Sequence, residues 1–360
     1  MKTEPIEIFV PGRLCLFGEH TDWAAGHRRQ NSKIEKGYAI VAPTNQGNYA
    51  RVVPLEEQVL VFKSFPLGRT MKLDLNEKSL LQIAEEGKEF SYVAGTAHEI
   101  IVNYNGHSTI LEINKLSHGL EIDNYHSDLP LKKGLSSSAS ICVLVARAFK
   151  EIYNLPLSTR GIMNIAYNGE ITTPSRCGKL DQACAYSSPV IMTFNADKFS
   201  AEELSTPKPL HEVIVDLKSH KDTKRILAEL NKGFPFPTND SEKKKHEYLA
   251  INKKVIEEAV NALRRGDSEH LGTLMTEAQL KFDEHMAPSC PEELTAPKLH
   301  CLLSLPKIHP YVFGGKGVGS QGDGCAQFVA RDEQCQKELI ELLNSDTEID
   351  VHAIPLTISS

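Results

Sequence analysis

Apolar and polar residues alternate near the start of the chain, a period-two pattern that predicts a β-strand. Ile6, Ile8 and Val10 form this run, which leads into Pro11-Gly12. Strand-like runs follow at residues 38–43, 59–62, 109–113 and 120–122. The N-terminal part of the chain is therefore expected to contain a sheet.

Other stretches have apolar residues every three or four positions, which predicts amphipathic helices. Residues 88–104 and 139–153 carry such stripes. Ser158 is a suitable N-cap for a further helix that ends near Glu170. The N-terminal part thus combines strands with helices.

The C-terminal part has its own pattern. Residues 214–217 look like the first strand of a second domain, after the Pro-containing stretch 205–210, and residues 245–303 are largely helical. The remaining order is strand (311–313), glycine-rich turn, strand (325–329), helix (332–343) and strand (351–357). We predict an α+β chain with two domains, residues 1–205 and 206–360.

Composition narrows the class of protein. The chain has 360 residues, 41% hydrophobic and 24% charged, as in ordinary globular proteins. It lacks the run of roughly 20 apolar residues that a membrane span needs, and Glu4 and Glu7 interrupt any signal peptide. A net charge of −7 gives no reason to propose a nucleic acid partner. Eight cysteines without a CxxC pair suggest free thiols, so we expect a cytoplasmic protein.

The segment LKKGLSSSAS, residues 131–140, lies between a predicted strand and a predicted helix. A glycine followed by hydroxyl residues at a helix start suits a phosphate group, because backbone N–H groups are free there and the helix dipole is positive. Serine hydroxyls can also bind phosphate oxygens or a magnesium ion. The alternative is a serine-rich loop with an ordinary N-cap.

Residues 11–23, PGRLCLFGEHTDW, place Arg13, Glu19, His20 and Asp22 close together in sequence. Carboxylates, a guanidinium and an imidazole can make several hydrogen bonds to a polyhydroxylated ligand. The alternative is a polar loop whose charges pair with one another. A metal site is less well supported, since His20 has no second histidine at ligand spacing.

Residues 172–182, TTPSRCGKLDQ, follow Glu170 and end in Asp181-Gln182. Asp181 opens an apparently buried helix, where an aspartate can act as a cap or as a general base. Glu170 could ligate magnesium. Each residue alone is more often structural than catalytic.

The glycine-rich segment at residues 314–324, GGKGVGSQGDG, formally contains GxGxxG. A strand-like run follows it, whereas the dinucleotide-binding fingerprint requires a helix. The P-loop pattern also fails, because Lys316 is followed by Gly317. We expect a flexible loop between strands that brings backbone close to a ligand.

These segments, in this order, resemble the GHMP kinase superfamily, which includes galactokinase, homoserine kinase and mevalonate kinase. The central motif runs from Pro130 to Ser140, and PGR-x-x-x-x-GEHTD is similar to the galactokinase segment. The resemblance implies an N-terminal mixed α/β domain and a C-terminal ferredoxin-like domain. It also implies an ATP- and Mg²⁺-dependent kinase that phosphorylates a sugar, at the anomeric hydroxyl of galactose or of a related sugar.

The resemblance further implies roles for individual residues. Asp181 would act on the proton of the acceptor hydroxyl, with Arg13 beside it to hold it ionised and to stabilise the transferring phosphoryl group. Glu19, His20 and Asp22 would contact sugar hydroxyls. Ser138 and Glu170 would hold magnesium. The ATP-binding residues would be Gly134, Leu135, Ser136, Ser137, Ser138 and Ala139.

Some positions depart from galactokinases, which have asparagine at Cys15 and tyrosine at Trp23. Lys132-Lys133 occupy places usually taken by small residues, with an effect that the sequence does not tell. The basic residues His27, Arg28 and Arg29 prompt the hypothesis of an acidic acceptor such as a uronic acid, against the plainer interpretation of a solvated surface loop.

Two other functions stay open. Phe17 in LFGEH resembles mevalonate kinase, which favours a non-sugar alcohol as acceptor, although Arg13 and Thr21-Asp22 argue against it. A catalytically silent relative would bind sugar and ATP as a regulator. Such proteins usually lose part of the phosphate loop or of the carboxylate–arginine pair, both of which this chain retains.

Overall fold

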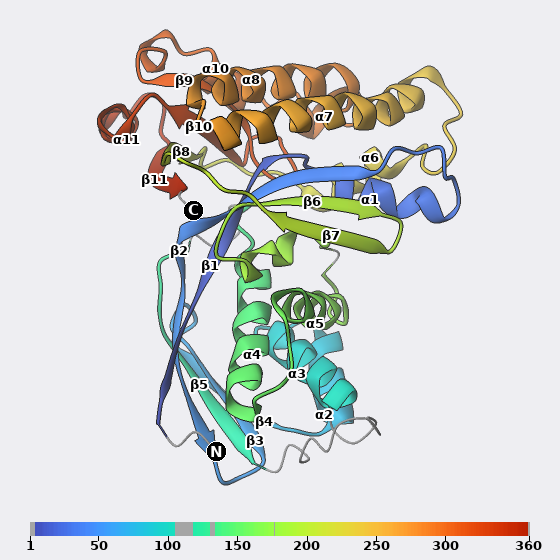
Figure 1. The fold of residues 1–360 in the computed structure, drawn as a ribbon, viewed down its shortest axis with the longest axis vertical. Helices are drawn as coiled ribbons and strands as arrows, with labels where there is room; N and C mark the ends of the chain where they lie inside the picture. Colours follow the sequence, from blue (N-terminus) through green and yellow to red (C-terminus); the bar gives the residue numbers. More distant parts are fainter. Residues whose placement is uncertain (1–3, 105–117, 130–133, 176, 359–360) are drawn as a thin grey trace. The chain divides into compact units, whose positions relative to one another are not determined.

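The computed structural model describes residues 4–104, 118–129, 134–175 and 177–358 (Figure 1). By its internal contacts the chain forms two compact units. The first consists of residues 1–13 and 45–187, and the second of residues 14–44 and 188–360. The domain boundary predicted between residues 205 and 206 stays a prediction.

Two long strands contribute residues to both units. Strand β1 spans Ile6–Phe17 and β2 spans Gly37–Leu55, and the two pair with each other. Both are longer than the sequence predicted. The predicted first strand does not stop at Pro11-Gly12 but continues to Phe17, so Arg13 lies within a strand and not in a loop after it.

The first unit carries a sheet in the order β4-β3-β5-β2. Its other strands are β3 (Val59–Ser64), β4 (Arg69–Asp74) and β5 (Gly119–Ser127). β3 and β5 run parallel, whereas β2 and β5 run antiparallel. The predicted strands at 59–62 and 120–122 are confirmed, and the strand predicted at 109–113 lies outside the described residues.

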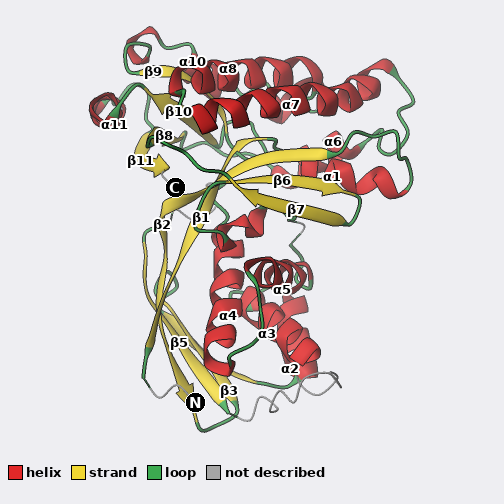
Figure 2. Cartoon of the chain, viewed as in Figure 1, coloured by secondary structure: helices red, strands yellow, loops and turns green. Residues whose placement is uncertain are grey.

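Helices gather on one side of this sheet (Figure 2). They are α2 (Glu77–Glu86), α3 (Ser91–Tyr104), α4 (Ser137–Tyr153), α5 (Thr159–Ile171) and the short 3₁₀ helix η2 (Asp181–Ala185). α3, α4 and α5 pack on one another. The predicted cap is confirmed, because the Ser158 side chain accepts a hydrogen bond from Gly161 N, which fixes the start of α5.

The second unit contains a four-stranded antiparallel sheet in the order β11-β8-β10-β9. The strands are β8 (Leu210–Asp216), β9 (Val312–Gly317), β10 (Cys325–Ala330) and β11 (His352–Ile358). Numbered along the chain, the spatial order is fourth, first, third, second, with helices after β8 and after β10. This is the ferredoxin-like arrangement, as predicted.

Helices cover both faces of this sheet. α11 (Glu333–Ser345) and α10 (Pro297–Leu303) bury the apolar face around Val213, Val215 and Phe328. On the other side α8 (Ser268–His285) lies on β9 and packs against α7 (Asp240–Arg265). The contact between α8 and β9 is close, because a Cβ at Gly314 would lie 2.0 Å from the carbonyl oxygen of Gly272.

The second unit also holds β6 (Val190–Asn195) and β7 (Lys198–Glu203), which extend the N-terminal half of β2. Its remaining helices are α1 (Thr21–Gly26), η1 (His27–Arg29), α6 (Thr223–Asn231), η3 (Ala287–Ser289), α9 (Pro291–Leu294) and η4 (Pro306–Ile308). Within the described ranges, no helix has the length and apolar content to cross a bilayer.

Candidate functional site

In the first unit Asp181 is held by two residues that are distant in sequence. Arg13, on β1, forms an ion pair with Asp181 Oδ1, and the hydroxyl of Ser136 donates to the same oxygen at 2.7 Å. The Asp181 side chain is 24% exposed and that of Arg13 only 8%. The structure therefore presents a carboxylate that is fixed by a buried cation and still reachable by solvent.

Arg13 also joins β1 to the loop before α4. Its backbone N–H donates to Leu135 O at 3.1 Å, and Nη1 donates to Gly134 O at 2.9 Å. Two residues of this loop have left-handed backbone conformations, Gly134 with φ of 77° and Ser136 with φ of 57°. A residue other than glycine in the left-handed region is strained and often marks a functional position.

Ser136 stands at the N-cap of α4 but its side chain does not cap the helix. The hydroxyl binds Asp181 instead, whereas Asn76, Ser158 and Asn239 do cap their helices with side-chain oxygens. The first N–H groups of α4 are thus not satisfied by Ser136, at the positive end of a 17-residue helix. This differs from the ordinary N-cap that was the alternative interpretation, and such a helix start can bind a phosphate group.

The next pair links the start of α4 to the end of α5. Ser138 Oγ donates to Glu170 Oε1 at 2.8 Å, and Gln182 Nε2 donates to Glu170 Oε2 at 2.8 Å. Burial raises the pKa of Glu170 to about 7, and the nearby Asp181 adds to the rise. A hydroxyl and a carboxylate side by side are the oxygen ligands that Mg²⁺ prefers, and Mg²⁺ commonly takes only one or two carboxylates from the protein.

The packing of α3 against α5 fixes the position of Glu170. A Cβ at Gly169 would lie 2.5 Å from Thr96 Cα, and one at Gly95 would lie 2.2 Å from the Gly169 carbonyl oxygen. Only glycine permits such close backbones. The close crossing of α3 and α5 therefore fixes the position of the Glu170 carboxylate.

Of the other predicted phosphate-binding residues, Ser137 lies in the first turn of α4, and Leu135 and Ala139 are buried. Pro130 and Lys132-Lys133 lie outside the described residues. In the parts of the chain that are described, no cluster of three or more histidine, cysteine, aspartate or glutamate side chains could hold a metal ion.

In the second unit Glu19, between β1 and α1, forms a buried ion pair with Lys316 of β9. The side chains are only 5% and 3% exposed, and Lys316 Nζ also donates to Gly317 O at 2.9 Å. A buried pair of this kind needs both partners, because either charge alone would be costly. Lys316 was not predicted as the partner of Glu19, since 297 positions separate the two residues.

His20 follows Glu19 in a strained turn with φ of 70°. The Thr21 hydroxyl, which lies 2.8 Å from Gly18 O and 2.9 Å from Tyr38 O, fixes this turn. The His20 ring is buried and stacks on Phe282, with ring centroids 5.8 Å apart. Asp22 lies in the first turn of α1 and is partly buried.

The basic residues after α1 have partners within the second unit. Arg28 Nε donates to Asn195 Oδ1 at 2.7 Å, and Arg29 forms an ion pair with Asp197. His27 Nε2 lies 2.8 Å from Asn231 Oδ1. Each of the three basic side chains is thus engaged in a contact within the protein. Their charges therefore give no support to an acidic acceptor.

The glycine-rich segment is only partly a loop. Residues 314–317 belong to β9, where Gly317 N donates to Gln279 Oε1 at 2.7 Å. Two hydrogen bonds hold residues 318–324. Lys221 Nζ donates to Gln321 O at 2.8 Å, and Asp323 accepts from Leu299 N at 2.8 Å. The expectation of a flexible loop was therefore wrong for its first part.

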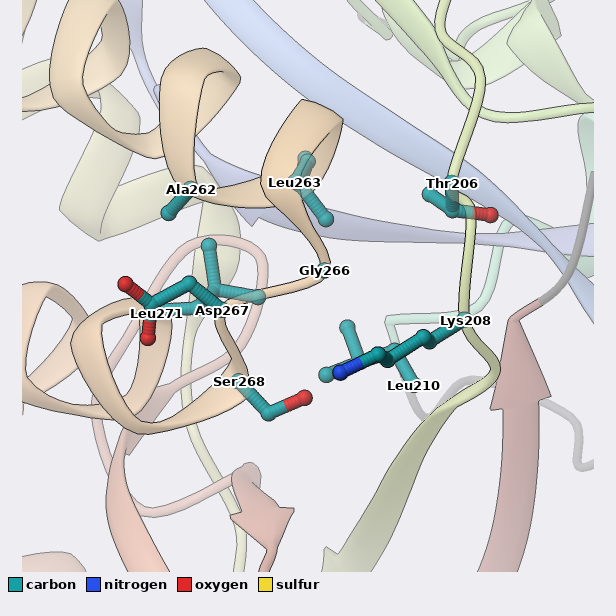
Figure 3. Close-up of a pocket in the computed structure, with 9 residues that line it drawn as sticks. All are labelled: Thr206, Lys208, Leu210, Ala262, Leu263, Gly266, Asp267, Ser268 and Leu271. Carbon is teal, nitrogen blue, oxygen red and sulfur yellow. The ribbon is translucent and has the colours of Figure 1, made fainter.

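A small cavity elsewhere in the second unit contains none of the predicted site residues. Figure 3 shows it between the end of α7, the start of α8 and the segment that leads into β8. Its volume is about 10 Å³, close to the minimum for one water molecule. Its lining comprises Thr206, Lys208, Leu210, Ala262, Leu263, Gly266, Asp267, Ser268 and Leu271.

Comparisons with known proteins find relatives in sequence and in fold. Residues 91–188 match the family of the GHMP kinases N terminal domain. A galactokinase of Pasteurella multocida is 25% identical over 366 residues, which cover 93% of this chain and 87% of that protein. A mevalonate kinase of Methanococcus jannaschii shares the fold with a TM-score of 0.73 and 21% identity, over 100% of both chains. The galactokinase of Lactococcus lactis complexed with galactose has a TM-score of 0.69 and 18% identity, over 99% of this chain and 94% of that one.

The matched segment, the fold and the relatives make the chain similar to GHMP kinases, and its sequence is similar to that of galactokinases. The predicted two-sheet α+β fold is confirmed.

Proposed function

We propose that this protein is a kinase that transfers the γ-phosphate of ATP to a hydroxyl of a sugar, with magnesium, and that the acceptor is the anomeric hydroxyl of galactose or of a related sugar. Galactokinase relatives that align over most of the chain support the sugar as acceptor. The observation that carries the proposal is the Asp181 carboxylate, held by Arg13 and by Ser136 of the phosphate-binding loop.

Asp181 receives the proton of the attacking hydroxyl or guides it electrostatically. Its ion pair with Arg13 orients the carboxylate for that task. The guanidinium also stabilises the charge that spreads over the transferring phosphoryl group. Phosphoryl transfer asks the protein mainly for positioning and for neutralisation of charge, which these residues supply.

The triphosphate binds at the start of α4, at Gly134, Leu135 and the residues 136–139. The uncapped N–H groups and the positive helix end support this assignment. Ser138 and Glu170 are the magnesium ligands in this proposal, since their oxygens already lie 2.8 Å apart. Magnesium would neutralise phosphate charge when bound.

Glu19, His20 and Asp22 bind the acceptor in this proposal. Glu19 is neutralised by Lys316, so it is oriented by a partner before any ligand arrives. We also retain the predictions of a cytoplasmic protein with small-molecule partners and without nucleic acid or membrane partners. The silent regulator is disfavoured because Arg13, Asp181, Glu170 and the phosphate-loop serines are all present.

A coupled ADP-release assay tests the proposal, with ATP and magnesium and a panel of neutral monosaccharides, uronic acids and mevalonate. We expect turnover with a neutral sugar. Turnover with mevalonate alone would select the non-sugar kinase. ATP binding without turnover across the panel would favour the regulator.

A further inference from the structure

The His20 imidazole makes a directional contact that the proposed acceptor role does not require. Trp23 Nε1 lies 3.2 Å from His20 Nδ1, and the two rings meet edge to face with centroids 6.1 Å apart. An indole N–H can only donate a hydrogen bond. Nδ1 must therefore offer its lone pair, and the ring proton of neutral His20 must be on Nε2.

Trp23 is itself anchored, so its N–H has a fixed direction. Its ring packs edge to face on Phe234 at 5.5 Å and on His27 at 6.5 Å. It also contacts the apolar cluster that includes Leu249. These rings hold the indole while the strained turn and Phe282 hold the imidazole.

Several groups around His20 oppose a second proton on the ring. Burial lowers the pKa of His20 to about 4, and the positive charges of Lys221 and Lys316 lower it further, while the backbone of Ser320 acts in the opposite direction. Glu19, the preceding residue, is already engaged with Lys316. The residue is thus a neutral imidazole near neutral pH.

Nε2 is buried and faces the backbone of Ser320, which acts on the ring as a hydrogen-bond acceptor, but this contact lacks good hydrogen-bond geometry. A buried donor whose acceptor is poorly placed is costly in a protein alone, and a ligand can supply an acceptor of better geometry. A neutral N–H donor suits an uncharged oxygen with a lone pair, such as a sugar hydroxyl.

We propose that Trp23 is a positioning residue that locks His20 as the Nε2–H tautomer, so that the acceptor site presents a fixed neutral donor to an acceptor oxygen. The inference rests on the proposed function for the identity of that ligand. The tautomer itself depends only on the pair of side chains. Galactokinases with tyrosine at this position have no indole N–H. This way of fixing the histidine tautomer is therefore expected only in chains with tryptophan there.

Nitrogen-15 NMR of histidine-labelled protein tests the lock without any turnover. The His20 signals among the 14 histidines are assigned by their loss in His20→Gln. We expect wild-type His20 to show a protonated Nε2 and an unprotonated Nδ1, unchanged between about pH 5 and pH 8. In Trp23→Phe, which removes the donor, we expect tautomer exchange or titration within this range. An Nδ1–H tautomer or an imidazolium in the wild type, or an unchanged ring in Trp23→Phe, would overturn the proposal.

Kinetics separate positioning from packing. In Trp23→Phe we expect the acceptor KM to rise about tenfold, as for one lost hydrogen bond, with the KM for ATP unchanged. Phe234→Leu removes the ring behind Trp23 and keeps its N–H, so it is the matched packing control. If Phe234→Leu raises the acceptor KM equally and leaves His20 unchanged by NMR, Trp23 acts through packing and the inference fails. If no acceptor is turned over at all, the proposed function fails while NMR still decides the Trp23–His20 relationship.

Discussion

The hydroxyl of Ser136 donates to Asp181 Oδ1 at 2.7 Å, and this contact joins the loop before α4 directly to the carboxylate beside it. It explains why Ser136 leaves α4 uncapped and adopts the left-handed conformation. Arg13 approaches the same oxygen from β1. A change at any of these residues should therefore affect transfer more than ATP binding alone.

Replacement of Asp181 by asparagine tests this most simply. Asparagine keeps the shape but has no negative charge, so it cannot take up the hydroxyl proton. We expect kcat to fall by about 10²–10⁴-fold, with the ATP dissociation constant nearly unchanged in a calorimetric titration. Asp197→Asn removes the carboxylate of a surface ion pair and is the control, expected to retain activity. Full turnover in Asp181→Asn would refute the assigned role.

The pair Ser138 and Glu170 predicts a specific magnesium defect. Ser138→Ala removes an oxygen ligand, and Glu170→Gln replaces a carboxylate by a neutral amide. The magnesium concentration for half-maximal rate should therefore rise, by about tenfold for one lost interaction of roughly 1.4 kcal/mol. A magnesium titration at saturating ATP measures this. Ser158→Ala removes the cap of α5, which costs about 1 kcal/mol of stability, and should leave the magnesium dependence unchanged. A magnesium dependence unaltered in both site variants would remove these residues as ligands.

Much of the fold was predictable because local patterns were strong. The Ser158 cap, the stripe over residues 139–153 and the closing strand–helix–strand pattern each correspond to an element of the structure. Strands β4, β6 and β7 and helices α1, α2 and α6 were missed. Hydrophobic alternation is weak in β7, where most residues are exposed, so its pairing with β6 and not its own pattern makes it a strand.

The crossing of α3 and α5 predicts a steric defect at Gly169. A Cβ there would meet Thr96 backbone, which cannot move aside as a side chain can. We expect Gly169→Ala to lower the free energy of unfolding by about 1–3 kcal/mol, measured by urea denaturation. Gly26→Ala is the matched control, because nothing lies within 4 Å of its added Cβ. Equal stability of the two variants would show that the helices tolerate a wider separation.

Buried Glu212 of β8 predicts an unusual pH dependence of stability. Neither carboxylate oxygen has a hydrogen-bond partner among the described residues, and burial raises the pKa from 4.5 to about 8. The folded state thus keeps a proton that the unfolded state loses, so stability falls as pH rises from 4.5 towards about 8. Glu212→Gln has no such proton, and its melting temperature should exceed that of the wild type at about pH 8 and approach it at about pH 5. A constant difference across this range would show that Glu212 is not protonated in the folded state.

The residues of the candidate site were proposed from the sequence, and the resemblance placed Arg13 beside Asp181 as the structure has it, but other pairings were not predicted. The residue types at Arg13, Asp181, Ser138 and Glu170 indicated phosphate chemistry, and resemblance assigned their roles. The pairing of Glu19 with Lys316 and the pairing of His20 with Trp23 were not predicted. Lys316 lies in another strand, and a tryptophan gives no sequence signal of where its N–H points. Tertiary contacts of this kind depend on packing, which local patterns do not encode.

Transfer of labelled phosphate tests the central claim most directly. The wild-type protein is incubated with [γ-³²P]ATP, magnesium and galactose or the best acceptor of the panel, and the products are separated. We predict label in a sugar monophosphate that releases phosphate in mild acid, as an anomeric phosphate does, and none with Asp181→Asn. Label that stays in ATP or appears only as inorganic phosphate, for every sugar tested, would contradict the account.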